Sequence, residues 1–268
     1  MRKLKNNFRY LTHNVMKFRN GLLLIFLLLN QLVFAQEIKL DSITKMDKNL
    51  ANELLKQWEE MGDSHISIKP ETPLRDDAFA MDDALKIELI AKHFKEIMHV
   101  LGLDLTDESL QGTPLRVAKM YVNEHFKGLD PKNKPEPTLF ENSYKYAEML
   151  VEKNIQFHST CEHHFVPIYG FAHVAYFSSG KVIGLSKLNR IVDYFARRPQ
   201  VQERMTVQIA QELKQVLGTD DVAVVIDAKH MCVASRGIKD TSSSTVTSSF
   251  HGKFLDTATR AELLRYIG

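Results

Sequence analysis

The sequence predicts an α+β fold in which helices come first and a segment in the order β-β-α-α-β-β follows. Apolar residues recur at helical spacing over residues 85–101, which indicates an amphipathic helix. After residue 138 the pattern changes to runs of strand-forming residues separated by turn residues. Two helical segments interrupt these strands, so we expect an antiparallel sheet with helices on one face.

Composition limits the class of protein. With 44% hydrophobic and 25% charged residues, the 268-residue chain is expected to be globular, with one to two domains. A formal net charge of +2 is too small to predict a nucleic-acid partner. Two cysteines exclude a disulfide framework; one bridge between them is possible, but their histidine neighbours favour metal ligation.

Residues 1–36 are similar to a secretory signal. Basic residues precede the apolar run 22–29, no acidic residue occurs before Glu37, and small or apolar residues suited to cleavage follow the run. The run is short for a stable membrane span of about 20 residues. The alternative is a misassigned start near Met46 or Met61. We expect a cytoplasmic protein; export or membrane tethering is the alternative.

The rest of the chain divides into a polar linker and one domain. Residues 37–81 form the linker, in which a short helix is predicted over 40–58. The domain is expected to span residues 82–268, with helices over 82–128 and the strand-rich core over 139–268.

Start and stop signals define the first two helices of this domain. Asp82 is an expected N-cap, and Gly102 ends the first helix. Thr113 followed by Pro114 predicts the second start, an N-cap with proline at the first helical position, and Gly128 closes that helix.

The elements of the core are predicted from the spacing of apolar residues and from the turn residues between them. Residues 178–180 (SSG) are expected to form the turn of a hairpin, and Gly218 to cap a helix. The Ser/Thr-rich stretch at 240–249 could be a flexible linker, but its end has strand propensity and no proline or glycine. The predicted elements are strands at 155–160, 166–177 and 181–185, helices at 187–196 and from 199 to 217, strands at 222–227, 231–236 and 245–250, and a last helix from about 257.

Cys161, His164 and Cys232 are candidate metal ligands. If the chain turns after Cys161, a Cys-x-x-His pair converges on one ion, and Cys232 adds a third ligand from downstream. Three protein ligands leave a fourth position for water, as in catalytic zinc sites. A closed structural zinc site, or ordinary buried cysteine and histidine, is the alternative.

His163 and His230 each lie beside an expected ligand. Histidine titrates near neutral pH, so both are candidates for general acid or base catalysis. Taken singly, each could equally orient a metal ligand.

A basic cluster opens the helix that follows residue 185. Ser186, Lys187 and Arg190 lie where free backbone N–H groups and the helix dipole favour a phosphate. Arg236 and Arg116 could add charge from elsewhere in the chain. A solvated basic helix face is the better interpretation of Lys187 and Arg190 taken alone.

Gln202 and Glu203 open the next helix. A buried carboxylate there could accept hydrogen bonds from the N1–H and 2-amino groups of guanine. The alternative is a surface glutamate whose negative charge interacts favourably with the helix dipole. The residues alone favour this alternative.

From about residue 85 to the C-terminus the chain resembles GTP cyclohydrolase I. The resemblance rests on four motifs in the family's order: 159–164 (STCEHH), 184–190 (GLSKLNR), 198–204 (RPQVQER), and 230–232 (HMC) with 236–237 (RG). It implies a tunnelling fold, in which subunits assemble their sheets into a toroidal homodecamer of two pentamers with active sites at subunit interfaces. The first 70 or so residues lie outside the resemblance.

The resemblance also implies residue roles. The implied zinc ligands are Cys161, His164 and Cys232, and the implied catalytic histidines are His163 and His230. Glu203 is implied to anchor guanine with help from Gln202, which reverses the surface interpretation. The implied triphosphate contacts are Ser186, Lys187, Arg190 and Arg236, with Arg116 reaching a neighbouring subunit's site. Glu162 receives no role.

The implied reaction converts GTP and water to formate and 7,8-dihydroneopterin triphosphate. Two other classes stay open on the residues. A related tunnelling-fold enzyme, such as a pterin synthase or a deazaguanine nitrile reductase, would need three histidine ligands or a lone nucleophilic cysteine, which the Cys161, His164 and Cys232 set opposes. An exported, non-enzymatic assembly stabilised by zinc is the other class.

Overall fold

The computed structural model describes residues 48–63 and 69–268. The chain divides into two units, Met1–Ser67 and Ile68–Gly268. In the first unit, helix α3 (Lys48–Asp63) carries mostly exposed side chains, among them Leu55 and Trp58. The prediction of a helix at 40–58 is confirmed for its described part, although α3 continues to Asp63. The predicted signal and the start of that helix lie outside the described residues.

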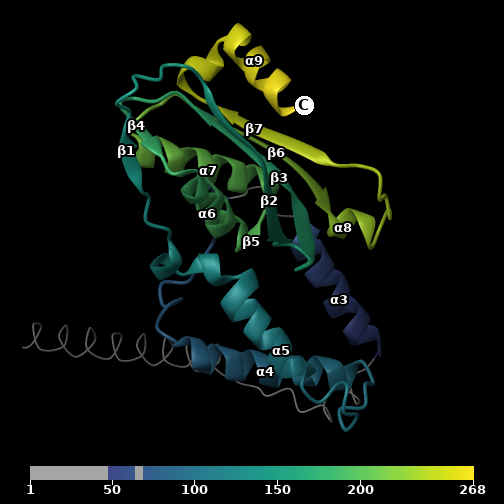
Figure 1. The fold of residues 1–268 in the computed structure, drawn as a ribbon. Coiled ribbons are helices and arrows are strands. Elements are labelled where there is room, and N and C mark those ends of the chain that lie inside the picture. Colours follow the sequence, from purple (N-terminus) through teal and green to yellow (C-terminus); the bar gives the residue numbers. More distant parts are fainter. Residues whose placement is uncertain (1–47, 64–68) are drawn as a thin grey trace, which may run out of the picture. The chain divides into compact units, whose positions relative to one another are not determined.

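The second unit holds the predicted α+β arrangement (Figure 1). Its elements are α4 (Asp83–Val100), α5 (Thr113–Met120), η1 (Tyr121–His125), η2 (Lys127–Leu129), η3 (Pro131–Asn133), β1 (Leu139–Glu141), β2 (Leu150–Cys161), β3 (Pro167–Tyr176), β4 (Lys181–Ile183), α6 (Leu185–Ala196), β5 (Pro199–Gln200), α7 (Gln202–Leu217), β6 (Val222–His230), α8 (Met231–Ala234), β7 (Thr245–Phe250), η4 (Gly252–Leu255) and α9 (Thr257–Ile267).

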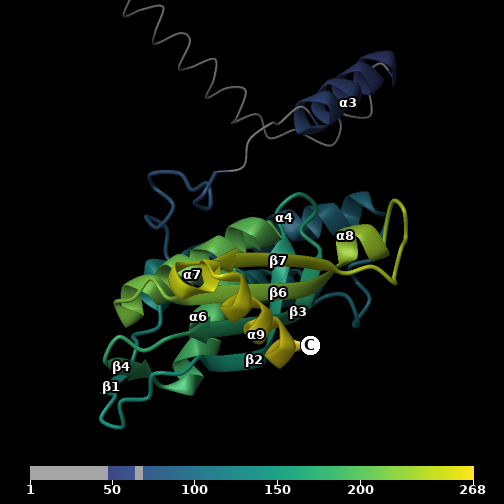
Figure 2. The same cartoon turned by 90° about the horizontal axis from the view of Figure 1, so that it is seen from above.

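The main sheet has five strands in the order β5-β2-β3-β6-β7. All neighbours are antiparallel except β5, a two-residue strand that runs parallel to β2. This sheet is therefore antiparallel in its body, as predicted. Figure 2 shows its long strands side by side, with α9 on them.

Two cores lie on opposite faces of the sheet. The larger core packs α6 and α7 against one face, where Phe157, Tyr176 and Met205 are buried. The smaller core packs α9 and η4 against the other face through Phe254 and Leu263. The prediction of helices on one face alone was therefore incomplete. Successive residues of a strand point to opposite faces, and in β3 and β6 both faces carry apolar side chains that helices cover.

The first two helices of the unit follow their local signals. Asp82 caps α4 by accepting a hydrogen bond from the N–H of Leu85 at 2.8 Å, and Gly102 follows the helix with a φ of +81°. The next helix departs from its prediction in two ways. Thr113 is its first helical residue rather than its cap, and the α-helix ends at Met120 in a π-helical turn and a 3-10 turn instead of continuing to Gly128.

The predicted hairpin across residues 178–180 is wrong. The turn exists, but β4 pairs with β1 in a separate two-stranded sheet instead of with β3. Both edges of β3 are already occupied, one by β2 and the other by β6, so β3 has no free edge for β4.

The predicted strand at 231–236 is also wrong, because residues 231–234 form the short helix α8. The ladder between β3 and β6 ends with the pair Ile168 and His230. Beyond it β3 has reached Pro167, which has no N–H to continue the ladder. Without a neighbouring strand to pair with, the chain forms a helical turn, in which the N–H of Ser235 donates to the carbonyl of Met231 at 2.8 Å.

Other boundaries shift less. Strand β2 begins at Leu150 rather than residue 155, because a bulge between Glu152 and Ile155 interrupts the alternation that predicted it. Helix α6 begins at Leu185, two residues early. Strands β1 and β5 were not predicted, whereas the strand at 245–250 and the helix end at Gly218, with a φ of +62°, are confirmed. Within the described residues, no helix is both long and apolar enough to cross a membrane.

Candidate active site

The three predicted metal ligands come together where the sheet ends. Cys161 is the last residue of β2, His164 lies in the turn that follows, and Cys232 lies on α8 directly after β6. Their ligand atoms all lie within 4.8 Å of one another. Cys161 is buried, Cys232 is half-buried and His164 is exposed, so the cluster opens to solvent on the histidine side.

Backbone hydrogen bonds hold the turn that carries two of these ligands. The N–H of Cys161 donates to the carbonyl of Val166 at 2.8 Å, and the N–H of Phe165 donates to the carbonyl of Cys161 at 2.9 Å. Residues 161–166 therefore form a closed loop. Within it the imidazole Nδ1 of His164 lies 3.9 Å from the sulfur of Cys161.

The chemistry of this donor set fits a zinc ion. Burial, together with the neighbouring Cys161, raises the pKa of the Cys232 thiol, since two adjacent thiolates repel each other. A divalent cation between them would reverse this effect by stabilising both thiolates. Zinc takes sulfur ligands at about 2.3 Å and nitrogen ligands at about 2.0–2.1 Å, so only small movements separate this cluster from a coordinating one.

Arg236 reaches the same cluster. Its guanidinium Nη1 lies 2.7 Å from Nε2 of His164. A guanidinium only donates hydrogen bonds, so this contact requires an unprotonated Nε2 and a proton on Nδ1. A metal ligated through Nδ1 needs the opposite tautomer, and Arg236 would then be released toward another acceptor.

His163 lies beside the cluster and differs from His164 in its surroundings. Its Nδ1 is 4.0 Å from the sulfur of Cys161, and its Nε2 is 3.8 Å from a carboxylate oxygen of Glu162. The side chain is 42% exposed. His163 is therefore placed to meet a substrate next to the cluster.

His230 is held by Gln202. The Nε2 atom of His230 lies 2.7 Å from the amide oxygen of Gln202. The amide nitrogen of Gln202 donates to the carbonyls of Ile226 and Thr245, at 3.2 and 2.8 Å, which fixes the amide orientation. Nε2 of His230 must then carry the proton, so Nδ1 is the acceptor in the neutral ring.

The predicted guanine-binding pair separates into a buried and an exposed residue. Gln202 is 1% exposed, and its amide is already bonded within the protein. Glu203 is exposed, and its carboxylate has no hydrogen-bonding partner among residues 48–63 and 69–268. Burial lowers the pKa of His230, while the nearby Glu203 carboxylate opposes this shift. Glu203 therefore lies close enough to His230 to influence its charge.

The predicted phosphate-binding cluster lies elsewhere. Ser186 and Arg190 are exposed, and Lys187 is half-buried, in the first turns of α6. Asn189, in the same turns, contacts Glu152 at 3.4 Å. Glu152 precedes Cys161 by nine residues on β2, which corresponds to about 30 Å of strand.

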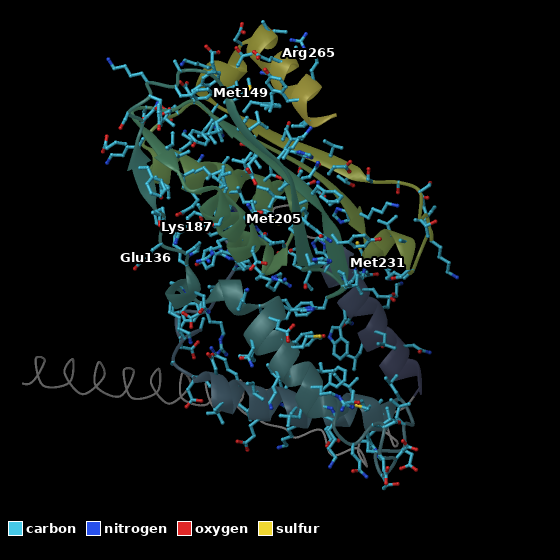
Figure 3. All side chains as sticks on the ribbon, in the orientation of Figure 1. Glu136, Met149, Lys187, Met205, Met231 and Arg265 are labelled. Carbon is cyan, nitrogen blue, oxygen red and sulfur yellow. The ribbon has the colours of Figure 1, made fainter. Side chains whose placement is uncertain are left out.

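The single chain therefore brings Arg236 to the metal ligands, but not the phosphate-binding cluster at the start of α6. Figure 3 shows the separation, with Lys187 well away from Met231, the neighbour of Cys232. Arg116 is likewise engaged locally, because its guanidinium donates to the carbonyl of Ser109 at 3.0 Å and to the hydroxyl of Thr113 at 3.2 Å.

A cavity of about 180 Å³ lies beside His230, lined also by Lys229, Met231 and Thr245. Sites for small molecules usually enclose about 300–1,000 Å³. This cavity of one chain is therefore too small for a nucleoside triphosphate.

Glu162 has a partner that was not predicted from the sequence. Its carboxylate accepts two hydrogen bonds from the guanidinium of Arg204, at 2.5 and 3.1 Å. One signal could have found it: Arg204 is the third residue of α7, where a positive charge opposes the helix dipole and needs a nearby anion.

Comparisons with known proteins agree with the motifs. The family model for GTP cyclohydrolase I matches residues 90–268. GTP cyclohydrolase 1 of Flavobacterium johnsoniae is 63% identical over 209 residues, which cover 78% of this chain and 94% of that protein. The Erwinia tasmaniensis protein of the same name is 55% identical over 198 residues, which cover 74% of this chain and 90% of that protein. The Aeromonas salmonicida protein is 56% identical over 195 residues, which cover 72% and 88%.

One solved structure, archaeosine synthase QueF-Like in the apo form, aligns with a TM-score of 0.30 and 15% identity. The alignment covers 43% of this chain and 94% of that chain. An overlap this weak carries no argument about fold or function.

Proposed function

The chain belongs to the GTP cyclohydrolase I family, and from that premise we propose how its residues divide the work of the reaction. The enzyme converts GTP and water into formate and 7,8-dihydroneopterin triphosphate, a step of pterin and folate biosynthesis. One water adds at C8 and the C8–N9 bond opens to a formamide. A second water releases formate, and the ribose carbons rearrange and close onto the freed amine with loss of one water.

We propose that Cys161, His164 and Cys232 hold a zinc ion. When bound at such a three-ligand site, zinc supplies a water with a pKa lowered to about 7. The observation that carries the proposal is the convergence of two sulfurs and one imidazole within 4.8 Å, from the 161–166 turn and from α8 far along the chain. An ordinary buried cysteine would not need this arrangement.

His163 and His230 are the proposed proton carriers. His230 receives a proton at Nδ1, because Gln202 holds the proton on Nε2. His163, on the exposed side of Cys161, serves the opposite side of the cluster. Each proton transfer of this kind contributes about 10²–10⁴-fold to the rate.

Glu203 is the proposed anchor of the guanine ring, through hydrogen bonds from N1–H and the 2-amino group. Its exposed carboxylate, near His230, supports this role. Gln202 helps by orienting His230 beside the ring. The proposed triphosphate contacts are Ser186, Lys187, Arg190 and Arg236, with Arg116 supplied by a neighbouring subunit.

We further propose that the active site is completed between subunits of a homodecamer with the tunnelling fold. The start of α6 lies about 30 Å from the metal ligands along β2, so the metal and phosphate clusters of one chain cannot bind one GTP. Strand β7 is bonded on one edge only within the described chain, which allows the sheet to continue into another subunit. Apolar residues of α4, such as Ile97 and Val100, are exposed in the single chain.

The domain limits and the location of the protein remain predictions. We propose residues 82–268 as the catalytic domain; the family match over residues 90–268 supports most of this range. We propose a cytoplasmic location because GTP is the substrate. The mature N-terminus, determined by mass spectrometry, tests the location and the start site together.

The direct test is an assay of the purified protein with GTP. Formate and the fluorescence of oxidised neopterin are expected from zinc-loaded, oligomeric protein, and both should vanish when a chelator removes zinc and return when zinc is added. The His163→Ala variant, with its zinc retained, is the matched control for the proton-transfer role. Zinc-loaded oligomer that releases no formate would contradict the proposed function.

A further inference from the structure

Glu162 and Arg204 form an ion pair beside the metal ligands, in which Arg204 is buried and Glu162 is partly buried. Both guanidinium Nη atoms contact the two oxygens of the carboxylate, at 2.5 and 3.1 Å. The Arg204 side chain is 3% exposed and the Glu162 side chain 18% exposed. The third nitrogen of Arg204, Nε, donates to the carbonyl of Lys69 at 2.8 Å. The guanidinium is therefore fixed in orientation as well as in position.

The two residues of the pair lie next to residues with different proposed tasks. Glu162 stands between Cys161 and His163 in the metal-binding turn. Arg204 directly follows Glu203 in the first turn of α7. A backbone contact supports the same junction, since the N–H of Glu162 donates to the carbonyl of Gln200 at 3.1 Å. The pair thus joins the turn that holds the metal to the helix that recognises guanine.

Stability alone is a weak reason for such a pair. Removing two charges from water costs free energy that their attraction often fails to recover, and apolar residues of similar size are frequently as stable. A bidentate arginine–carboxylate contact does fix distance and angle between the elements that carry its partners. Lysine, a flexible point charge, cannot reproduce this geometry.

Direct chemical roles for Glu162 agree less well with its contacts. Both carboxylate oxygens are bonded to Arg204, so neither is positioned as a general base. The convergent ligand group consists of Cys161, His164 and Cys232 and does not include Glu162. One of these oxygens also lies 3.8 Å from Nε2 of His163, so the carboxylate can hold that imidazole in place.

We propose that the Glu162–Arg204 pair is a positioning device that sets His163 and the metal ligands at a fixed distance from the guanine-binding Glu203. The inference rests on the proposed function. In this proposal GTP is anchored by its guanine ring at Glu203 on α7, and it reacts at C8 beside the metal-binding turn. Loosening the pair should therefore displace C8 from the reactive groups while leaving the grip on the guanine and triphosphate intact.

The test compares Glu162→Gln and Arg204→Lys with the wild-type enzyme. Each variant should keep its zinc and bind GTP within about threefold of the wild-type Kd, while kcat falls about 10- to 100-fold, the loss expected when reacting atoms are misplaced by about 1 Å. The double variant Glu162→Gln/Arg204→Lys should lose little more than either single variant, because the two residues act as one unit.

Glu212→Gln is the matched control. Glu212 also lies on α7, its side chain is 8% exposed, and it pairs with Lys134 at 2.7 Å, but it does not touch the metal-binding turn. Its variant should lose thermal stability comparably and keep kcat within about twofold of wild type.

Three results would overturn the positioning role. They are an unchanged kcat in both pair variants, loss of zinc in them, or failure of both to fold when followed by circular dichroism; the last two would mean that the pair serves metal binding or stability instead. Wild-type enzyme that makes no product would contradict the proposed function itself, which is a separate outcome.

Discussion

The two ends of the main sheet are built differently. At one end, ladder pairs, a closed turn and the buried amide of Gln202 hold the metal ligands and His230 in place within a single chain. At the other end, Ser186 and Arg190 are exposed at the start of α6. The proposed reactive groups are therefore held in place within one chain, whereas the proposed triphosphate contacts at α6 need a second subunit to complete a site.

This difference separates two kinds of binding energy. Preorganised groups act on the reacting atoms and raise kcat, whereas remote contacts position the substrate. Variants at the metal end should lower kcat, and variants at the phosphate end should mainly raise KM.

Loss of a metal ligand should have the largest effect. Cys232→Ser removes one of two sulfurs, so we expect zinc to be lost and activity to fall at least about 10³-fold, since zinc contributes several kcal/mol to the hydrolytic steps. Metal analysis by mass spectrometry checks this result. Full zinc occupancy in this variant would refute Cys232 as a ligand.

Loss of a proton carrier should come next. We expect His163→Ala to lower kcat about 10²–10⁴-fold while zinc and GTP binding stay near wild type. Steady-state kinetics with parallel metal analysis separates this outcome from ligand loss. A variant that loses zinc would assign His163 to the metal instead.

A change at the proposed phosphate end should raise KM rather than lower kcat. Lys187→Met removes one proposed charged contact to the triphosphate. A contact of this kind is worth about 1.5–3 kcal/mol, so KM should rise about 10- to 100-fold with kcat little changed. Lys95→Met on α4, an exposed lysine with no proposed contact with GTP, is the control. A fall in kcat at constant KM would place Lys187 among the reactive groups and break the comparison.

The support of His230 should matter less than His230 itself. Gln202→Leu removes the acceptor of Nε2–H, and we expect kcat to fall about 10-fold, as for other residues that orient a catalytic group. Gln208→Leu is the control, because Gln208 is also buried on α7 but its amide bonds to Gln200, to the carbonyl of Pro70 and to Glu71. Equal losses of kcat in both variants would show that packing, not orientation, is responsible.

The smallest effect is expected at the far end of α6. Burial raises the pKa of Asp193, but hydrogen bonds from Lys127 and Arg197 outweigh it and hold the pKa below its usual value of 3.8. The ionised carboxylate therefore adds stability above that pH, and the contribution is lost as the pH falls through the lowered pKa. Because the side chain is 38% exposed, Asp193→Asn should cost less than about 1 kcal/mol at neutral pH.

Thermal unfolding from neutral to acidic pH checks this last prediction. The difference between wild type and Asp193→Asn should shrink as the pH falls below 3.8, and kcat should not change. A difference that persists in acid would assign the effect to packing.

Local chemistry could predict much of this structure. The cap at Asp82, the left-handed Gly218 and the spacing of Cys161 and His164 depend on neighbours within a few residues, and the structure agrees with each. Elements that depend on distant partners could not be predicted in this way. The segment after His230 has strand propensity. It forms the short helix α8 instead, because β3 ends opposite His230 and offers no further strand partner.

The Glu162–Arg204 pair shows the same limit within the site. Its members are 42 residues apart, and the pairing of β2 with β5, directly before α7, brings them together. The separation of the metal and phosphate clusters is also a property of strand order and length. Motifs that follow one another along the chain gave no sign that they lie at opposite ends of the sheet.

The most direct test of the account is complementation between two inactive variants. Cys232→Ser lacks the metal end and Lys187→Met/Arg190→Met lacks the phosphate end, and each protein alone should be nearly inactive at low GTP. If each site takes its two ends from different chains, random co-assembly after co-expression should restore about one quarter of the wild-type activity. Mixed oligomers that stay inactive would mean that both ends of a site come from the same chain, which contradicts the account.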